Sequence, residues 1–421
     1  MDLIKQAVAA ASNPAHSKWV CPLLWSADAL LCFVIVWRIP YTEIDWRAYM
    51  QQVAIYVSGE RDYVKISGDT GPLVYPAAHV YVYRLLYAVT DEGRDIVRAQ
   101  YIFVNLYLVT LGLVMQCYRH ARVPPYVFPM LILSKRLHSI FMLRLFNDGP
   151  AVLLLFLAIL CYQSRQWTLG SLFFSLGLGT KMSLFLALPA VGATLWQGTG
   201  KDRAIGQATF IGQLQVLLGY PFLAGNFKSY LSRAFEFTRQ FMFKWTVNWR
   251  FVGEDVFLSK TFSTALLAIH AALLAVFMST RWLKPSGDSI PSIVLQLLGY
   301  KASPTPQQHV AISRRVTSDF ILTVTLTSVI LGCLCARSLH YQFYAYIAWS
   351  TPFLLWRSRV PIIVQYFIWG MQEWAWNVYP SSSLSSAIVV GCLGFQVVAI
   401  WAGTWNPSAG GQARPEQGKD E

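Results

Sequence analysis

Charged residues are scarce in this sequence. Asp, Glu, Lys and Arg together make up 13% of its 421 residues, whereas hydrophobic residues make up 55%. A soluble domain cannot hide so much apolar surface, so the composition excludes an ordinary globular protein and predicts a chain embedded in a lipid bilayer. The net charge of +13 is scattered between apolar segments and forms no basic stripe, so we expect no nucleic-acid partner.

Metal and nucleotide signatures are also missing. The seven cysteines lie mostly within apolar runs, and none has a nearby His at zinc-ligand spacing, which argues against a zinc site and a disulfide framework. The sequence has no HExxH, no DxD, no Walker loop and no GxGxxG run that opens a helix after a strand. We therefore expect no metal and no cofactor.

Apolar runs long enough to cross a hydrocarbon core of about 30 Å recur along the chain. The basic connections at 119–122, 165, 201–203, 281–315 and 357–359 all fall on one side if the N-terminus is cytosolic, as the positive-inside rule requires. This pattern predicts an all-α polytopic membrane protein with about twelve transmembrane helices. The expected spans begin near Cys21, Gln100, Tyr126, Pro150, Thr168, Ser183, Ala204, Phe262, Phe320, Gln342, Val360 and Leu384.

The same pattern divides the chain. Residues 1–20 are expected to form a cytosolic N-terminal segment, residues 21–405 the transmembrane domain and residues 406–421 a disordered cytosolic tail. Within the domain, the first luminal loop spans 41–98, and residues 281–318, rich in Pro, Ser and Gln, are expected to form a flexible cytosolic loop.

An apolar, aromatic stretch at 77–89 lies within that first luminal loop. We interpret it as an interfacial helix, because a span at this point would invert every later basic connection.

Two polar motifs follow the first expected span. TEIDWRAYM at 42–50 places Glu43 and Asp45 at the predicted luminal surface, where a carboxylate can act as a base or can simply favour a helix start. GDTGPLVYPA at 68–77 has two Gly and two Pro, which shape a loop around Asp69 and Tyr75.

Charges next to apolar sequence form a second group. HSIFMLRLFNDGP at 138–150 contains Arg144 and Asp148, and Lys181 lies in the short turn GTKMS. Charges near membrane depth cost on the order of 2.5 to 3.5 kcal/mol, so they tend to be paired or functional. A helix end with a snorkelling Arg144 is the alternative.

Aromatic residues mixed with cations form the third group. RQFMFKWTVNWRF at 239–251 combines Arg250 with Trp245 and Trp249, a mixture that can bind a phosphate and a sugar or lipid, or can form an interfacial helix. RSLHYQFYAY at 337–346 contains His340, which is either a structural hydrogen-bonding residue or a phosphate or sugar contact.

These motifs, in this order, closely resemble the dolichyl-phosphate-mannose dependent alpha-1,3-mannosyltransferases of asparagine-linked glycosylation, over approximately residues 37–355. The resemblance implies a GT-C type fold with interfacial luminal helices in the endoplasmic reticulum membrane. It also implies a site facing the lumen, a dolichyl-phosphate-mannose donor and a Man(5)GlcNAc(2)-PP-dolichol acceptor.

The resemblance further implies a catalytic carboxylate in the first luminal loop. A beta-linked donor and an alpha product imply inversion with one base, while the leaving phosphate needs cations around it. The base is expected to be Asp45, within EIDW. The expected donor-phosphate ligands are Arg250, Lys181, His340 and Arg144. The expected acceptor and sugar contacts are Glu43, Asp69, Tyr75, Asp148, Trp245, Trp249 and Tyr341.

Alternative functions remain open at this point. Another lipid-phosphate-sugar glycosyltransferase of the same superfamily would carry similar motifs. A transporter or flippase predicts functional charges at mid-membrane and internal symmetry, whereas these motifs gather at one predicted face and the sequence has no internal repeat. A scaffold of a glycosylation complex is the third alternative.

Overall fold

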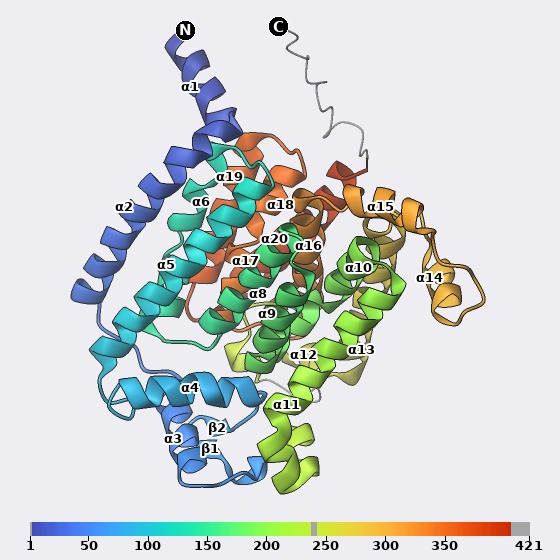
Figure 1. The fold of residues 1–421 in the computed structure, drawn as a ribbon. Helices are drawn as coiled ribbons and strands as arrows, with labels where there is room; N and C mark the ends of the chain where they lie inside the picture. Colours follow the sequence, from blue (N-terminus) through green and yellow to red (C-terminus); the bar gives the residue numbers. More distant parts are fainter. Residues whose placement is uncertain (1, 237–241, 406–421) are drawn as a thin grey trace, which may run out of the picture.

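The computed structural model describes residues 2–236 and 242–405, and nearly all of its regular structure is helical (Figure 1). The prediction of an all-α chain is confirmed. In the described ranges, β1 (Ser67–Gly68) and β2 (Gly71–Pro72) form one antiparallel hairpin. The tail expected at 406–421 and the first residues of the 239–251 motif lie outside the described residues.

The helices fall into two groups by length. The longer helices are α1 (Asp2–Ser12), α2 (Ser17–Arg38), α3 (Trp46–Val57), α4 (Ala77–Val89), α5 (Ile96–His120), α8 (Asp148–Gln163), α9 (Trp167–Thr180), α10 (Leu188–Thr199), α11 (Lys201–Ala234), α13 (Lys260–Phe277), α15 (Pro306–Arg315), α16 (Ser318–Cys335), α19 (Ile362–Asn377) and α20 (Ser383–Gly403). The shorter helices are α6 (Pro129–Ile132), α7 (Lys135–His138), α12 (Glu254–Leu258), α14 (Ile290–Leu297), α17 (Tyr344–Ala348) and α18 (Thr351–Arg357).

In the described part of the chain, five helical segments are long and apolar enough to cross a bilayer, and they contain α2, α5, α13, α16 and α20. The helices Pro125–Ile132 and Lys135–Leu143 are bent by 48° relative to each other, and they raise the number of such segments to six if the pair is counted as one span. The expected spans near Pro150 and Thr168 are α8 and α9, of 16 and 14 residues. These helices are roughly 24 and 21 Å long at 1.5 Å per residue. The predicted count of twelve is not confirmed, because turns divide several apolar runs into short helices.

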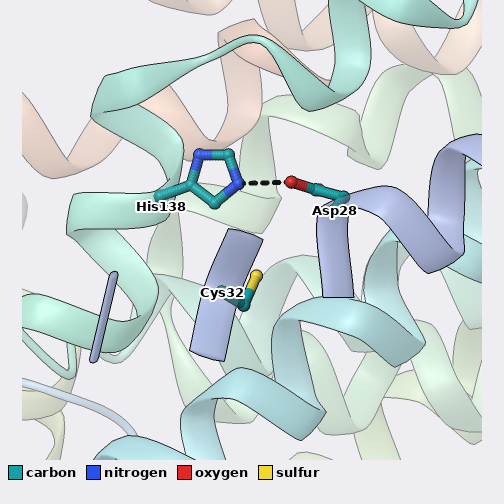
Figure 2. A group of neighbouring side chains, drawn as sticks. All are labelled: Asp28, Cys32 and His138. Atoms are coloured by element: carbon teal, nitrogen blue, oxygen red, sulfur yellow. Dashed lines mark hydrogen bonds and ion pairs between the residues drawn. The ribbon is translucent and has the colours of Figure 1, made fainter. Parts of the chain in front are cut away.

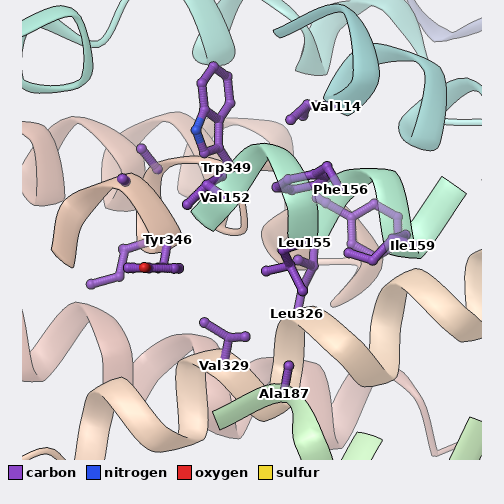
Figure 3. Packing of buried hydrophobic residues seen from close by; sticks show 14 of the residues in the cluster. Val114, Val152, Leu155, Phe156, Ile159, Ala187, Leu326, Val329, Tyr346 and Trp349 are labelled. Atoms are coloured by element: carbon purple, nitrogen blue, oxygen red, sulfur yellow. The ribbon is translucent and has the colours of Figure 1, made fainter. Parts of the chain in front are cut away.

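The centre of the bundle is built around α16. Residues 321–333 of this helix are buried without interruption, as expected for a helix that is apolar on every side. Leu155 and Phe156 of α8 share one buried cluster with Leu326 and Val329 of α16 (Figure 3). Helix α8 also packs against α5 and α9, so the start of α8 is held firmly within the bundle.

Helices α3 and α4 and the β1–β2 hairpin form a separate layer, which we call the basal layer, at the lower end of the bundle in Figure 1. Helix α4 has 13 residues and runs across that end. The hairpin lies so close to α3 that a Cβ on Gly68 would be 2.6 Å from the carbonyl oxygen of Ala48. Glycine at this position therefore holds the loop against α3.

The basic connections predicted to be cytosolic lie near one another, away from the basal layer. Arg165 donates a hydrogen bond of 3.3 Å to the hydroxyl of Ser313, and Lys201 Nζ donates one of 2.5 Å to the carbonyl of Gln296. Three of these connections therefore touch. The segment 281–318 contains α14 and α15, and its flexibility stays a prediction.

Candidate active site

The start of α3 separates the roles of Glu43 and Asp45. Glu43 is exposed, and its Oε1 accepts a hydrogen bond of 3.1 Å from the backbone N–H of Arg47, while its Oε2 accepts one of 2.5 Å from the hydroxyl of Tyr41. Glu43 therefore accepts a hydrogen bond from the first turn of α3, where backbone N–H groups have no acceptor within the helix. Asp45 occupies the N-cap position but makes no capping bond, so its carboxyl is available for other contacts.

The half-buried carboxyl of Asp45 turns toward the basal-layer loop and α3. It accepts hydrogen bonds from the hydroxyls of Thr70 and of Tyr49, the latter at 3.4 Å from Oδ2. Withdrawal from water raises the pKa of Asp45 above its ordinary value, while the charge of Lys181 and these hydrogen bonds oppose the rise. A carboxylate with a raised pKa is a stronger base than an exposed one.

Lys181 and Asp148 form a buried ion pair beside Asp45. Lys181 Nζ lies 2.5 Å from Asp148 Oδ2 and 2.8 Å from Asn147 Oδ1, and all three residues are buried. Asp148 opens α8, where a helix N-terminus favours negative charge. Lys181 follows α9 with extended backbone. The turn after α9 and the start of α8 thus bring opposite charges together, and both charges act on Asp45.

Aromatic rings enclose the buried ion pair on the basal side. The ring centroids of Tyr75 and His79 are 4.5 Å apart, and Lys181 Nζ lies 5.9 Å from the Tyr75 centroid. His79 Nδ1 is 3.3 Å from Asn147 Nδ2. Burial, and after it the charge of Lys181, lowers the pKa of His79 to about 3, so this imidazole is neutral and accepts the bond from Asn147.

A second group, which we call the arginine cluster, contains Arg136, Arg144 and Arg250 beside Tyr341. The guanidinium carbon of Arg136 lies 4.6 Å from the centroid of the Tyr341 ring, and the charges of Arg136 and Arg250 both act on the Tyr341 hydroxyl. Arg136 and Arg144 in turn act on each other. This places Arg136 and Arg250 beside the Tyr341 ring, with Arg144 close to Arg136.

The arginines of this cluster bind neutral oxygens. Arg136 Nε donates to the carbonyl of Trp376 at 3.0 Å, Arg250 Nε donates to the hydroxyl of Ser381 at 3.0 Å, and Arg144 donates to the hydroxyl of Ser139. Among the described residues, no carboxylate forms an ion pair with any of the three. The charge of Glu373 acts on Arg136, but that carboxylate accepts a hydrogen bond of 2.6 Å from Tyr344.

The short helix η9 (Tyr341–Phe343) connects the two groups. Its first residue belongs to the arginine cluster, and the ring of its last residue, Phe343, has its centroid 5.7 Å from Lys181 Nζ. His340 is half-buried and directly precedes η9. The buried ion pair and the arginine cluster are therefore adjacent parts of one region.

Other expected site residues lie toward solvent or make structural contacts. Asp69 is exposed and forms an ion pair of 2.9 Å with Arg47. Trp249 donates to the carbonyl of Ala336 at 3.0 Å, and Trp245 is exposed. The structure thus brings Asp45, Tyr75, Asp148 and Lys181 together and gathers Arg144, Arg250 and Tyr341 separately. It does not bring Glu43, Asp69 or Trp245 into either group.

Several residues of this region were not predicted. Asn147 directly precedes Asp148, and His79 follows Tyr75 by one helical turn, so sequence spacing contained a signal for both. Tyr49 likewise lies four residues after Asp45 on α3. Arg136 had no comparable signal, because its partner Tyr341 is distant in the sequence.

One group of potential metal ligands occurs within the described ranges, and it lies outside this region. Ligand atoms of Asp28, Cys32 and His138 all lie within 4.8 Å of one another (Figure 2). His138 Nε2 and Asp28 Oδ1 are in direct hydrogen-bonding contact at 2.8 Å, and Tyr107 donates to Asp28 Oδ2 at 2.6 Å. Asp28 and His138 thus satisfy each other directly, and the pair joins α2 to the bend at α7.

Comparison with known proteins identifies the family of this chain. The family model described as ALG3 protein matches residues 22–386. A Neurospora crassa protein named Dol-P-Man:Man(5)GlcNAc(2)-PP-Dol alpha-1,3-mannosyltransferase is 53% identical, over 99% of this chain and 96% of its own. Proteins of the same name from Mus musculus and Homo sapiens are both 41% identical, over 92% and 93% of this chain and 88% of their own. The chain therefore belongs to the ALG3 protein family.

Proposed function

We propose that this protein transfers mannose from dolichyl-phosphate-mannose to Man(5)GlcNAc(2)-PP-dolichol in an alpha-1,3 linkage. Relatives that carry the name of this activity align with nearly the whole chain. The observation that carries the mechanism is the half-buried carboxyl of Asp45, which is free of helix capping and lies within the field of the buried ion pair.

In the proposed reaction, Asp45 accepts the proton of the acceptor 3-hydroxyl. The hydroxyl oxygen forms a bond to the anomeric carbon of mannose while the bond from that carbon to the phosphate oxygen breaks. Dolichyl phosphate leaves with the electron pair, and the beta-linked donor gives an alpha product by inversion. The raised pKa of Asp45 supports this role, because it increases the affinity of the carboxylate for the proton.

The arginine cluster is the proposed site of the donor phosphate. Partly buried cations without a carboxylate partner favour an anionic ligand, and guanidinium groups bind phosphate oxygens in pairs. Arg144 and Arg250, which the sequence led us to expect as phosphate ligands, are proposed for this site together with Arg136 and Tyr341, and His340 lies next to Tyr341.

On the acceptor side, the ammonium of Lys181 is bound to Asp148. We therefore assign it chiefly to the charge balance around Asp45, with the donor phosphate as a secondary contact. Tyr75 and Asp148 are proposed to orient acceptor sugars. Glu43, Asp69, Trp245 and Trp249 are proposed to contact more distant parts of the glycan.

We further propose a GT-C type enzyme of the endoplasmic reticulum membrane with about twelve membrane-crossing segments, α4 as an interfacial helix and the site facing the lumen. The bent pair before α8 and the shorter apolar helix α8 support more crossings than five. The orientation is supported by the basic connections predicted to be cytosolic. Tags at Gly68 and Ser286 test it: protease protection in microsomes is expected for Gly68 only, and protection of Ser286 contradicts the orientation.

The activity is tested with purified protein, radiolabelled dolichyl-phosphate-mannose and the pentamannosyl lipid acceptor. We expect a hexamannosyl product whose new residue is released by an alpha-1,3-specific mannosidase. A different linkage would indicate another lipid-dependent glycosyltransferase. Movement of lipid across proteoliposomes without transfer would indicate a flippase, and absence of both would indicate a scaffold.

A further inference from the structure

A cavity of about 740 Å³ lies between the ends of α5, α8 and α18 and the beginning of α16. Its lining includes Arg122, Arg165, Asp319, Trp356, Arg357 and Arg359. The four arginines belong to the basic connections predicted to be cytosolic, Asp319 and Trp356 lie close to them in the sequence, and none of the six belongs to the candidate active site. The proposed transfer reaction uses no residue of this cavity.

The lining has a positive charge that its own residues do not neutralise. It contains four guanidinium groups and one carboxylate, a difference of three positive charges. Arg357 Nη2 and Asp319 Oδ2 form an ion pair of 3.2 Å. The ends of α5, α8 and α18 each contribute roughly half a negative charge, which lowers the positive charge by about half but does not reverse it.

The donors in the cavity are only partly used. Arg165 donates to the hydroxyl of Ser313 at 3.3 Å, and the buried Nε of Arg357 has no hydrogen-bond acceptor among the described residues. Arg122 and Arg359 are exposed, and their guanidinium groups bind no residue in the described part of the chain. An anion with several oxygens would therefore find donors from three helix ends.

Backbone conformation distinguishes these arginines from ordinary helix-end residues. Arg122, Arg165 and Arg359 have φ values of 58°, 62° and 62°, and each directly follows the C-cap residue of its helix. Glycine or Asn is usual at such a left-handed position, because a Cβ is unfavourable there. If these positions only had to form a turn, glycine would be the more favourable residue. Arginine at all three positions therefore indicates that the positive charge has a function.

We propose that this cavity binds the phosphate headgroup of an anionic phospholipid. The cavity lies between helices of a membrane-embedded bundle, and basic pockets in this position bind acidic headgroups. Trp356 in the lining is of the type that settles at headgroup level. A phosphate monoester headgroup, with more charged oxygens than a zwitterionic phosphodiester, matches the remaining positive charge best.

The test uses the full chain in nanodiscs of phosphatidylcholine, with and without phosphatidic acid. Bound lipid is measured by native mass spectrometry and stability by thermal unfolding. The double variant Arg122→Gly/Arg359→Gly removes two charges but suits the left-handed backbone. Arg38→Gln/Arg84→Gln, which changes two exposed arginines elsewhere, is the matched control.

We expect phosphatidic acid to bind and stabilise the wild type and the control, and the Gly variant to bind it at least about tenfold more weakly. The Gly variant should unfold like the wild type in phosphatidylcholine alone. Equal binding of phosphatidic acid by the Gly variant and the wild type would overturn the proposal. So would protection by inorganic phosphate with none by the lipid, which would indicate a soluble anion as the ligand.

Discussion

The buried ion pair and the arginine cluster lie side by side, but their charges are balanced differently. Lys181 and Asp148 neutralise each other and are closed off from solvent, and Lys181 also donates a hydrogen bond to Asn147. Arg136, Arg144 and Arg250 bind neutral oxygens and form no ion pair with a carboxylate of the described ranges. In the first arrangement neither buried charge is left without a partner, whereas the second leaves positive charge for a ligand.

The largest effect is expected from Asp45→Asn, which keeps the size of the side chain but removes the base. Turnover should fall by about 10²- to 10⁴-fold, the usual contribution of general-base assistance, with folding and acceptor binding retained. Steady-state transfer assays measure the loss. Glu43→Gln is the control, because Glu43 binds the first turn of α3.

If Glu43→Gln abolishes transfer and Asp45→Asn does not, the base is Glu43. If both variants are active, Asp148 is the next carboxylate to test, and the buried ion pair would then belong to the chemistry.

Next in size is Lys181→Met, which leaves Asp148 buried without its cation. Removal of one partner of a buried pair typically costs about 3 to 5 kcal/mol in unfolding free energy. Thermal unfolding in detergent should show a clearly lowered midpoint. The double variant Lys181→Met/Asp148→Asn should recover part of the loss, because no unpaired charge remains.

The matched comparison is Arg250→Met, which should lower the unfolding midpoint much less, since Arg250 has no described carboxylate partner. Equal destabilisation by Lys181→Met and Arg250→Met would remove the distinction between the two groups.

Arg250→Ala should instead impair use of the lipid donor. A phosphate-facing cation in a site shielded from water contributes on the order of 2 to 4 kcal/mol to the transition state, so kcat/KM for dolichyl-phosphate-mannose should fall by roughly 30- to 900-fold. Lys244→Ala is the control, because Lys244 is exposed and its ammonium lies over the ring of Trp245. Normal donor kinetics in Arg250→Ala would exclude Arg250 from the phosphate site.

The smallest effect is expected from Thr70→Val, which removes one of the hydrogen bonds that lower the pKa of Asp45. The pKa of Asp45 should then rise further, so the base becomes deprotonated only at higher pH. The acid limb of the pH–rate profile should move upward, while the rate on the plateau stays within about twofold. Ser58→Ala, at the other end of α3, should leave the profile unchanged. A downward shift in Thr70→Val would contradict the assignment of Asp45.

Much of the site could be predicted because loops at the same end of a helical bundle converge. Parity of the basic connections assigned the loop of Asp45 and the turns of Asp148 and Lys181 to one face, and the structure brings them together. The choice between Glu43 and Asp45 depended on individual hydrogen bonds, which a sequence pattern does not contain. The place of Arg136 in the site could not be predicted, because it depends on a tertiary contact with the ring of Tyr341, which is distant in the sequence.

The fold was predictable to a similar extent. Hydropathy identified the all-helical class and the spans at α2, α5, α13, α16 and α20. It did not resolve the turns that divide the run after Tyr126 into α6 and α7 and the run after Gln342 into α17 and α18, because a hydropathy average is insensitive to a turn inside an apolar run. The short length of α4 did follow from the sequence, because polar residues flank that apolar stretch.

The close approach of Gly68 to Ala48 has a consequence for how the chemistry tolerates sequence change. Thr70 is two residues from Gly68, and its hydroxyl forms a hydrogen bond with Asp45. The distance between the backbones of Gly68 and Ala48 therefore sets the position of the Thr70 hydroxyl. A methyl group at Gly68 would act as a spacer that moves the hairpin away from α3. The proton affinity of the proposed base is thus tuned by steric fit between two uncharged backbone segments, and a neutral substitution there would alter the acid–base behaviour of Asp45 without changing any ionisable group.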